Sequence, residues 1–166
     1  LTDAEKEDAV VMGADTIVCV RQSADSKQLE QGQEEKFFVL GKPKDEADAA
    51  LNAGKVVFFA GGTGHPYFST DTGVVLRAIE MEADEILLAK AIDGVYDSDP
   101  KVNPDAKKFD TITIEDVVEK RLQVIDLAAS ILCLENRMPM AVFGLEGEDS
   151  IYQAMKGNIT GTRVTV

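Results

Sequence analysis

The stretch that decides the fold is KVVFFAGGTGHPYFSTD, residues 55–71. Its first part, Lys55–Ala60, is short, apolar, β-branched and aromatic, which is typical of a strand buried on both faces. A glycine-rich loop follows over Gly61–Thr70, and apolar residues then recur at helical spacing through Asp71–Glu82. A strand, a loop and a helix in this order predict one repeating unit of an α/β protein.

The same alternation continues towards the C-terminus. Further strands are predicted over Glu85–Lys90, Met140–Leu145 and Arg163–Val166, and further helices over residues 45–51, 113–121, 126–137 and 150–157. A long polar connection, Ile92–Asp110, separates two of these units. Strands that alternate with helices favour a mostly parallel sheet between two helical layers, which is a three-layer αβα sandwich.

The first fifty residues have a different character. They hold two predicted strands, Ala14–Val20 and Phe37–Leu40, separated by a segment rich in Gln, Ser, Asp and Glu. That segment, residues 21–36, has the composition of a flexible insertion. We therefore predict two parts, residues 1–50 and residues 51–166.

Composition narrows the possible functions. The chain has 166 residues, 45% hydrophobic and 28% charged, which suits a globular domain with a real core. Its net charge of −13 repels phosphate backbones at long range and argues against a general nucleic-acid binder. No apolar run approaches the roughly 18 residues of a membrane helix, and nothing suggests export. Cys19 and Cys133 lie in apolar runs and are expected to be buried, reduced thiols, which fits the cytoplasm.

The glycine-rich loop is the first candidate site. Its glycines let backbone N–H groups approach a ligand, Thr63, Ser69 and Thr70 offer hydroxyls, and the following helix offers the positive end of its dipole. A phosphate group suits such a site, although the Gly-Lys-Ser/Thr ending of a Walker A loop is absent. The alternative is a plain turn in which Ser69, Thr70 and Asp71 only cap the helix.

The second candidate site is DGVYDSDP, residues 93–100, which also follows a predicted strand. Its three carboxylates suit Mg²⁺ or ribose hydroxyls, and Tyr96 suits contact with a base. The alternative is a solvated acidic turn.

Together the two stretches resemble bacterial uridylate kinases (UMP kinases) of the amino acid kinase superfamily. The resemblance covers residues 55–166 in one register, through GGTGHPYFSTD (61–71), RAIEMEAD (77–84), DGVYDSDP (93–100) and the closing Gly161-Thr162. It implies an amino acid kinase-like fold for residues 51–166. It also implies transfer of the γ-phosphoryl group of ATP to UMP, giving UDP for pyrimidine nucleotide synthesis.

The resemblance assigns roles to individual residues. The UMP-binding segment would be Thr63, Gly64, His65, Pro66, Tyr67, Phe68, Ser69 and Thr70, with His65 where the family has asparagine. Asp71 would be catalytic and would organise the transferring phosphate with Mg²⁺ that arrives with ATP. Lys90, Tyr96 and Asp99 would contact ATP; for Lys90 the alternative is a lysine whose ammonium group only reaches solvent from a strand end.

The resemblance also implies a cytoplasmic homo-oligomer regulated by nucleotides such as UTP or GTP, with no nucleic-acid or membrane partner. One departure affects activity. The family's Lys-Leu-Ser-Gly-Glu-like turn and Gly-Gly-Gly loop, which cradle phosphate and supply a catalytic lysine, have no counterpart in residues 1–54. We therefore expect impaired kinase activity.

Residues 8–18 and 40–49 resemble a second family, the Maf nucleotide pyrophosphatases, which cleave UTP or dTTP to the monophosphate and pyrophosphate. That resemblance would make Asp15 the catalytic acid and Lys42 a phosphate-facing lysine; alternatively, Asp15 caps a strand and Lys42 lies in a surface turn. A third hypothesis is a uridine-nucleotide-binding or assembly module without catalysis. The chain itself could be a chimera, a rearranged kinase fragment, or separate pieces of a longer protein joined end to end.

Overall fold

The computed structural model describes residues 9–13, 16–21 and 43–166. The predicted strand Phe37–Leu40, almost all of the predicted insertion, and both Asp15 and Lys42 lie outside these residues. Within the described part, no helix is long and apolar enough to cross a bilayer.

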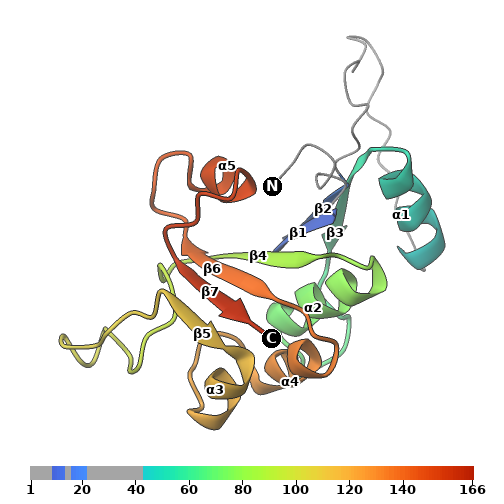
Figure 1. The fold of residues 1–166 in the computed structure, drawn as a ribbon. Helices are drawn as coiled ribbons and strands as arrows, with labels where there is room; N and C mark the ends of the chain where they lie inside the picture. Colours follow the sequence, from blue (N-terminus) through green and yellow to red (C-terminus); the bar gives the residue numbers. More distant parts are fainter. Residues whose placement is uncertain (1–8, 14–15, 22–42) are drawn as a thin grey trace.

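Seven strands of the described residues form a single sheet in the order β3-β2-β1-β4-β6-β7-β5 (Figure 1). The strands are β1 (Ala9–Gly13), β2 (Thr16–Arg21), β3 (Val56–Ala60), β4 (Glu85–Lys90), β5 (Thr111–Thr113), β6 (Met140–Gly144) and β7 (Thr162–Thr165). The helices are α1 (Pro43–Asn52), α2 (Thr70–Glu80), α3 (Ile114–Glu119), α4 (Leu127–Glu135) and α5 (Ser150–Met155). The predicted strand–helix alternation from residue 55 onward is confirmed.

The centre of the sheet is parallel and its margins are mixed. β4 lies between β1 and β6 and runs parallel to both. β2 is antiparallel to β1 and to β3, and β7 is antiparallel to β6 but parallel to β5. Strands from both sides of residue 50 therefore pair in one sheet, while the division into two parts stays a prediction.

Two strands were not predicted. β1 is a five-residue apolar run, and the strand described in the region expected at Ala14–Val20 is β2, Thr16–Arg21. β5 has only three residues, of which Ile112 alone is buried, so it carries too little alternation to be recognised. Thr113 caps α3 as expected, because its hydroxyl oxygen accepts a hydrogen bond from the N–H of Asp116.

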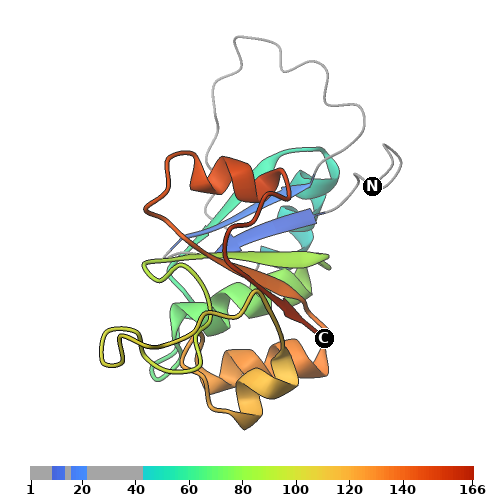
Figure 2. The ribbon, with the colours of Figure 1, turned by 60° about the vertical axis from the view of Figure 1, so that its left-hand side comes forward.

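Helices cover both faces of the sheet, which gives the predicted three layers. The inner strands β4 and β6 alternate their side chains between two cores: Ile86, Leu88, Met140 and Val142 face the larger one, and Leu87, Ala89, Ala141 and Phe143 face the smaller one. α1, α2, α3 and α4 contribute residues to the larger core, and α5 contributes Ala154 to the smaller one. α5 lies on the opposite face of the sheet from α2 and α4 (Figure 2). The three-layer α/β class is confirmed.

The sulfur of Cys133 belongs to the larger core, where its side chain is fully buried. Burial raises the pKa of the Cys133 thiol to about 12, so it remains a protonated, unreactive thiol at neutral pH. Its predicted burial is confirmed.

Strand direction decides where loops gather. β3, β2 and β1 are successively antiparallel, so β3 points in the same direction as β1, β4 and β6. The segments that follow β3, β4 and β6 therefore leave the sheet at one edge, outside the carboxyl ends of the strands. Ligands of open α/β sheets bind at such an edge.

Substitution of Gly161 tests how closely the chain before β7 packs against β6. A Cβ atom added at Gly161 would lie 1.7 Å from the carbonyl oxygen of Val142, so Gly161→Ala must push the backbone of β6 away. We expect a loss of at least about 2 kcal/mol, or a melting temperature lower by roughly 4–8 °C, in a circular-dichroism melt.

The matched control is Gly147→Ala, whose added Cβ would meet only the Cβ of Ser150 at an ordinary 3.5 Å. Its melting temperature should stay within about 2 °C of the parent chain. Equal melting temperatures for the two variants would contradict the close approach of these strands.

Candidate active site

The loop between β3 and α2 has a backbone that glycine makes possible. Gly61, Gly62 and Gly64 have positive φ angles of 95°, 61° and 72°, a region that side chains disfavour. Tyr67 also has a positive φ of 71°, and its side chain is fully exposed. The residues predicted to bind UMP therefore form a protruding loop, in which the rings of Tyr67 and Phe68 face solvent.

The end of this loop starts α2. The hydroxyl oxygen of Ser69 accepts hydrogen bonds from the N–H groups of Asp71, at 3.1 Å, and Thr72, at 3.3 Å. Ser69 thus caps α2, and Thr70 is the first residue of the helix. Earlier in the loop, the hydroxyl oxygen of Thr63 accepts a 3.2 Å hydrogen bond from the N–H of His65. These hydrogen bonds fix the start of α2 and part of the loop before it.

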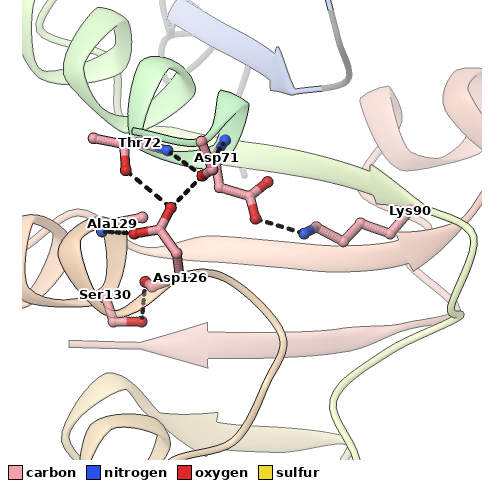
Figure 3. Close-up of polar contacts among 7 residues, drawn as sticks. Asp71, Thr72, Lys90, Asp126, Ala129 and Ser130 are labelled. Atoms are coloured by element: carbon pink, nitrogen blue, oxygen red, sulfur yellow. Dashed lines mark hydrogen bonds and ion pairs between the residues drawn. The ribbon is translucent and has the colours of Figure 1, made fainter. Parts of the chain in front are cut away.

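Asp71 and Lys90 meet at the edge of the sheet. The ammonium nitrogen of Lys90, the last residue of β4, lies 2.7 Å from a carboxylate oxygen of Asp71 in the first turn of α2 (Figure 3). Both side chains are mostly buried, with exposed fractions of 24% and 20%. The structure therefore brings together two residues that the sequence placed in different roles. The ammonium group of Lys90 pairs with the carboxylate of Asp71 and does not only reach into solvent.

Asp126 joins two helices beside this pair. One of its carboxylate oxygens accepts hydrogen bonds from the hydroxyls of Ser69 and Thr72, the latter at 2.9 Å. Its other oxygen accepts a 2.9 Å hydrogen bond from the N–H of Ala129 and so caps α4 (Figure 3). The N-termini of α2 and α4 thus converge on one carboxylate, where their dipoles favour negative charge.

The pKa of Asp126 reflects these contacts. Partial burial by itself raises the pKa, but hydrogen bonds from Ser69, Ala129 and Thr72 to the charged form outweigh it, so the pKa is lowered from the usual 3.8. Asp126 is therefore ionised at neutral pH, with its negative charge satisfied within the protein.

A cavity of about 920 Å³ opens next to these residues. Its polar wall includes Asp71, Lys90, Asp126 and Ser130, and its apolar wall includes Leu127 and Ile131, which are 62% and 40% exposed. Two helix N-termini and an ammonium group at one edge can bind an anion such as a phosphate. This arrangement fits phosphate chemistry.

The second predicted stretch forms a separate cluster. Asp99 accepts a 2.9 Å hydrogen bond from the N–H of Lys101, and the hydroxyl of Tyr96 donates a 2.7 Å hydrogen bond to Asp93. Lys108 forms a 2.8 Å ion pair with the other oxygen of Asp93. The structure therefore ties Tyr96 to Asp93 and Lys108, whereas Asp99 orders its own turn.

Two residues of these clusters were not identified as site residues from the sequence. Asp126 was predicted only as a helix start, because its partner Ser69 lies 57 positions earlier. Lys108 lies 15 positions after Asp93 within a polar connection that shows no periodicity. No local pattern could have found either of them.

Asp126→Ala tests the junction of the two helices. The variant removes the cap of α4 and leaves the hydroxyls of Ser69 and Thr72 without their acceptor, so we expect a loss of about 2 kcal/mol and a melting temperature lower by about 4–8 °C. The control is Asp105→Ala, an exposed aspartate in the connection after β4 that lies outside both helices. The junction would be refuted if both variants melted at the same temperature.

The fall in melting temperature at acidic pH gives a second test of Asp126. Because its pKa is lower in the folded than in the unfolded chain, its contribution is present above the unfolded pKa and is lost as pH falls through the folded pKa. We expect Asp126→Asn to reduce the fall in melting temperature between about pH 5 and pH 3. If Asp126→Asn left the fall in melting temperature between about pH 5 and pH 3 unchanged, Asp126 would not be the cause of that fall.

Comparisons with known proteins address the family of this chain. The model of the amino acid kinase family matches residues 10–144. A uridylate kinase from Mycoplasmopsis synoviae (strain 53) is 52% identical over 116 residues, which cover 69% of this chain and 48% of that protein. The predicted resemblance to UMP kinases is confirmed.

Solved structures agree. The UMP kinase from Bacillus anthracis superposes with a TM-score of 0.69 at 31% identity, covering 98% of this chain and 60% of that one. The UMP kinase from Ureaplasma parvum gives a TM-score of 0.68 at 36% identity, covering 74% and 53%. The chain thus spans about half the length of the relatives it matches. With a family model matched over residues 10–144 and a fold shared with these enzymes, the chain belongs to the amino acid kinase family.

Proposed function

We propose that this chain carries the acceptor and donor sites of a UMP kinase, which transfers the γ-phosphoryl group of ATP to UMP. The observation that carries the proposal is the Asp71–Lys90 pair at the N-terminus of α2, at the edge where β3 and β4 both end. It supports phosphoryl transfer because a phosphate placed there meets backbone N–H groups, a helix dipole and an ammonium group.

UMP is the proposed ligand of the glycine-rich loop between β3 and α2. Thr63–Thr70 would hold it, with the exposed rings of Tyr67 and Phe68 available to its base and the start of α2 available to its phosphate. His65 would hold the place of the family's asparagine as a hydrogen-bond donor. The three positive-φ glycines support this role, because they keep the backbone bare where a ligand approaches.

Asp71 is the proposed catalytic residue. Its pairing with Lys90 fixes one of its oxygens, which orients the carboxylate towards the cavity at the start of α2. Lys90 would in turn place positive charge near the moving phosphoryl group and the ATP phosphates.

Mg²⁺ is the proposed companion of ATP. Among the described residues no group of three or more metal-binding side chains occurs. A single carboxylate such as Asp71 fits the way Mg²⁺ binds in nucleotide sites, where phosphates and waters supply most ligands. When bound, Mg²⁺ neutralises charge on the transferring phosphoryl group.

Tyr96 and Asp99 are proposed to contact ATP from the connection that follows β4. This connection leaves the same edge of the sheet as the UMP loop, which supports two nucleotides meeting there in line. Activity of this chain alone is proposed to be impaired, because the family's lysine turn and glycine loop have no sequence counterpart here. A cytoplasmic homo-oligomer that serves pyrimidine synthesis and responds to UTP or GTP is part of the same proposal.

The proposal predicts that the chain converts ATP and UMP to ADP and UDP with Mg²⁺, followed by phosphorus NMR. Asp71→Ala should lower the rate about 100-fold or more, because it removes the charge that organises the transferring group. The control is Asp48→Ala on α1, distant in sequence from both loops, which should keep the parent rate. Equal rates for Asp71→Ala and the parent chain would refute the role of Asp71.

The same spectra separate the alternatives. Pyrophosphate released from UTP or dTTP, and lost in Asp15→Ala, would favour the Maf-like pyrophosphatase. Thermal stabilisation by UMP without any turnover would favour a binding module; a ligand at 100 times its Kd adds about 2.7 kcal/mol. If the chain shows no turnover and UMP does not stabilise it, the proposed UMP site is refuted.

A further inference from the structure

Lys108 closes a small network around one carboxylate. Its ammonium nitrogen lies 2.8 Å from Oδ2 of Asp93 and 3.3 Å from the carbonyl oxygen of Thr160. The other oxygen of Asp93 accepts the 2.7 Å hydrogen bond from the hydroxyl of Tyr96. Asp93 is thus held on one side by an ammonium group, and it holds the phenol of Tyr96 on the other.

The backbone brings these residues together from distant parts of the connection. Tyr96 and Lys108 form an antiparallel bridge, and the N–H of Phe109 donates a 2.9 Å hydrogen bond to the carbonyl of Val95. The hydroxyl of Thr162 on β7 accepts from the N–H of Val95 at 2.8 Å and donates to the carbonyl of Phe109 at 2.5 Å. The two arms of the connection are therefore fixed to each other and to the sheet.

Packing holds the stem of Lys108 as well. A Cβ added at Gly94 would lie 2.8 Å from Cδ of Lys108 and 2.7 Å from the hydroxyl of Thr162, so the lysine methylenes lie directly against the backbone of Gly94. Only 29% of the Lys108 side chain is exposed. Asp93 is 56% exposed, so the pair is open to solvent, but a lysine whose stem is already confined loses less entropy on pairing than an ordinary surface lysine.

Charge agrees with this geometry. The hydrogen bond from Lys108, followed by that from Tyr96, lowers the pKa of Asp93, and the same bond raises the pKa of Lys108. Asp93, Tyr96 and Asp110 are the titratable groups that act on the ammonium group. The network is therefore charged at neutral pH, where a nucleotide would bind.

Two residues of the network, Asp93 and Lys108, line a second cavity, of about 440 Å³, between the connection after β4 and α5. Glu146 and Glu148 line it as well, and within the described part of the chain Lys108 is the single cation of its lining. Three carboxylates disfavour a phosphate, whereas Ser150, Gln153 and Asn158 offer uncharged hydrogen-bonding groups. The uncharged nucleoside end of a nucleotide suits this cavity better than its phosphates do.

We propose that Lys108 is a positioning residue for the phosphoryl donor: it holds Asp93 at the wall of the second cavity, with Tyr96 hydrogen-bonded beside it, in the arrangement that receives the nucleoside end of ATP. This inference rests on the proposed function, which assigns Tyr96 and Asp99 to ATP. Lys108 touches no reacting atom, so its loss weakens the binding of ATP and spares the binding of UMP and the chemical step.

The test is isothermal titration of the full chain with the ATP analogue AMP-PNP and Mg²⁺, and separately with UMP. Lys108→Met keeps the length of the stem and removes the charge; it should weaken AMP-PNP about tenfold and leave the Kd of UMP within about twofold. Lys108→Arg, which can still pair with Asp93, should restore AMP-PNP to within about threefold of the parent chain. In turnover assays, the KM for ATP should rise in Lys108→Met while kcat stays near the parent value.

Each other outcome overturns the inference. Unchanged AMP-PNP binding in Lys108→Met, with UMP still bound, would remove the role of Lys108 and leave the proposed function standing. Equal loss of both nucleotides, with a lower melting temperature, would make Lys108 a residue of general stability. A parent chain that binds neither nucleotide would overturn the proposed function, and this inference with it.

Discussion

The arrangement of the candidate site depends on one carboxylate. Asp126 accepts hydrogen bonds from the N-terminal ends of both α2 and α4, and it thereby fixes the two helices that border the larger cavity. Asp71 stands in the first turn of α2, so its position opposite Lys90 follows from the same junction. Two positive helix ends thus share one satisfied carboxylate at this edge of the sheet.

The sheet supplies the other half of the arrangement. Because β3, β4 and β6 run in one direction, three segments leave the sheet at one edge: the glycine-rich loop after β3, the connection that carries Tyr96, and the segment before α5. Two cavities border this edge: Asp71, Lys90 and residues 117–131 line the first, and residues near α5 line the second. A phosphoryl group passing between two nucleotides needs such a meeting of loops.

Local patterns predicted most of the fold from residue 55 onward. β3, α2 and β4 were recognisable because strand and helix periodicities alternate there, and caps such as Thr113 mark helix starts. β1 and β5 were not predicted, because short strands that are stabilised by their neighbours show little hydrophobic periodicity in the sequence. Asp71 and Lys90 were found singly, but their contact, like those of Asp126 and Lys108, depends on residues far apart in sequence that only the folded sheet brings together.

The distance along the chain between Ser69 and Asp126 has a consequence for how the protein is made. A ribosome releases the start of α2 well before Asp126, so during synthesis α2 has its own cap but not the acceptor that joins it to α4. The central strand β4 can pair with β1, which is translated earlier, but its other parallel neighbour, β6, is translated after both α3 and α4. Non-local pairings of this kind slow folding. The junction of α2 with α4 therefore forms only after Asp126 has been translated, later than the local cap that Ser69 provides.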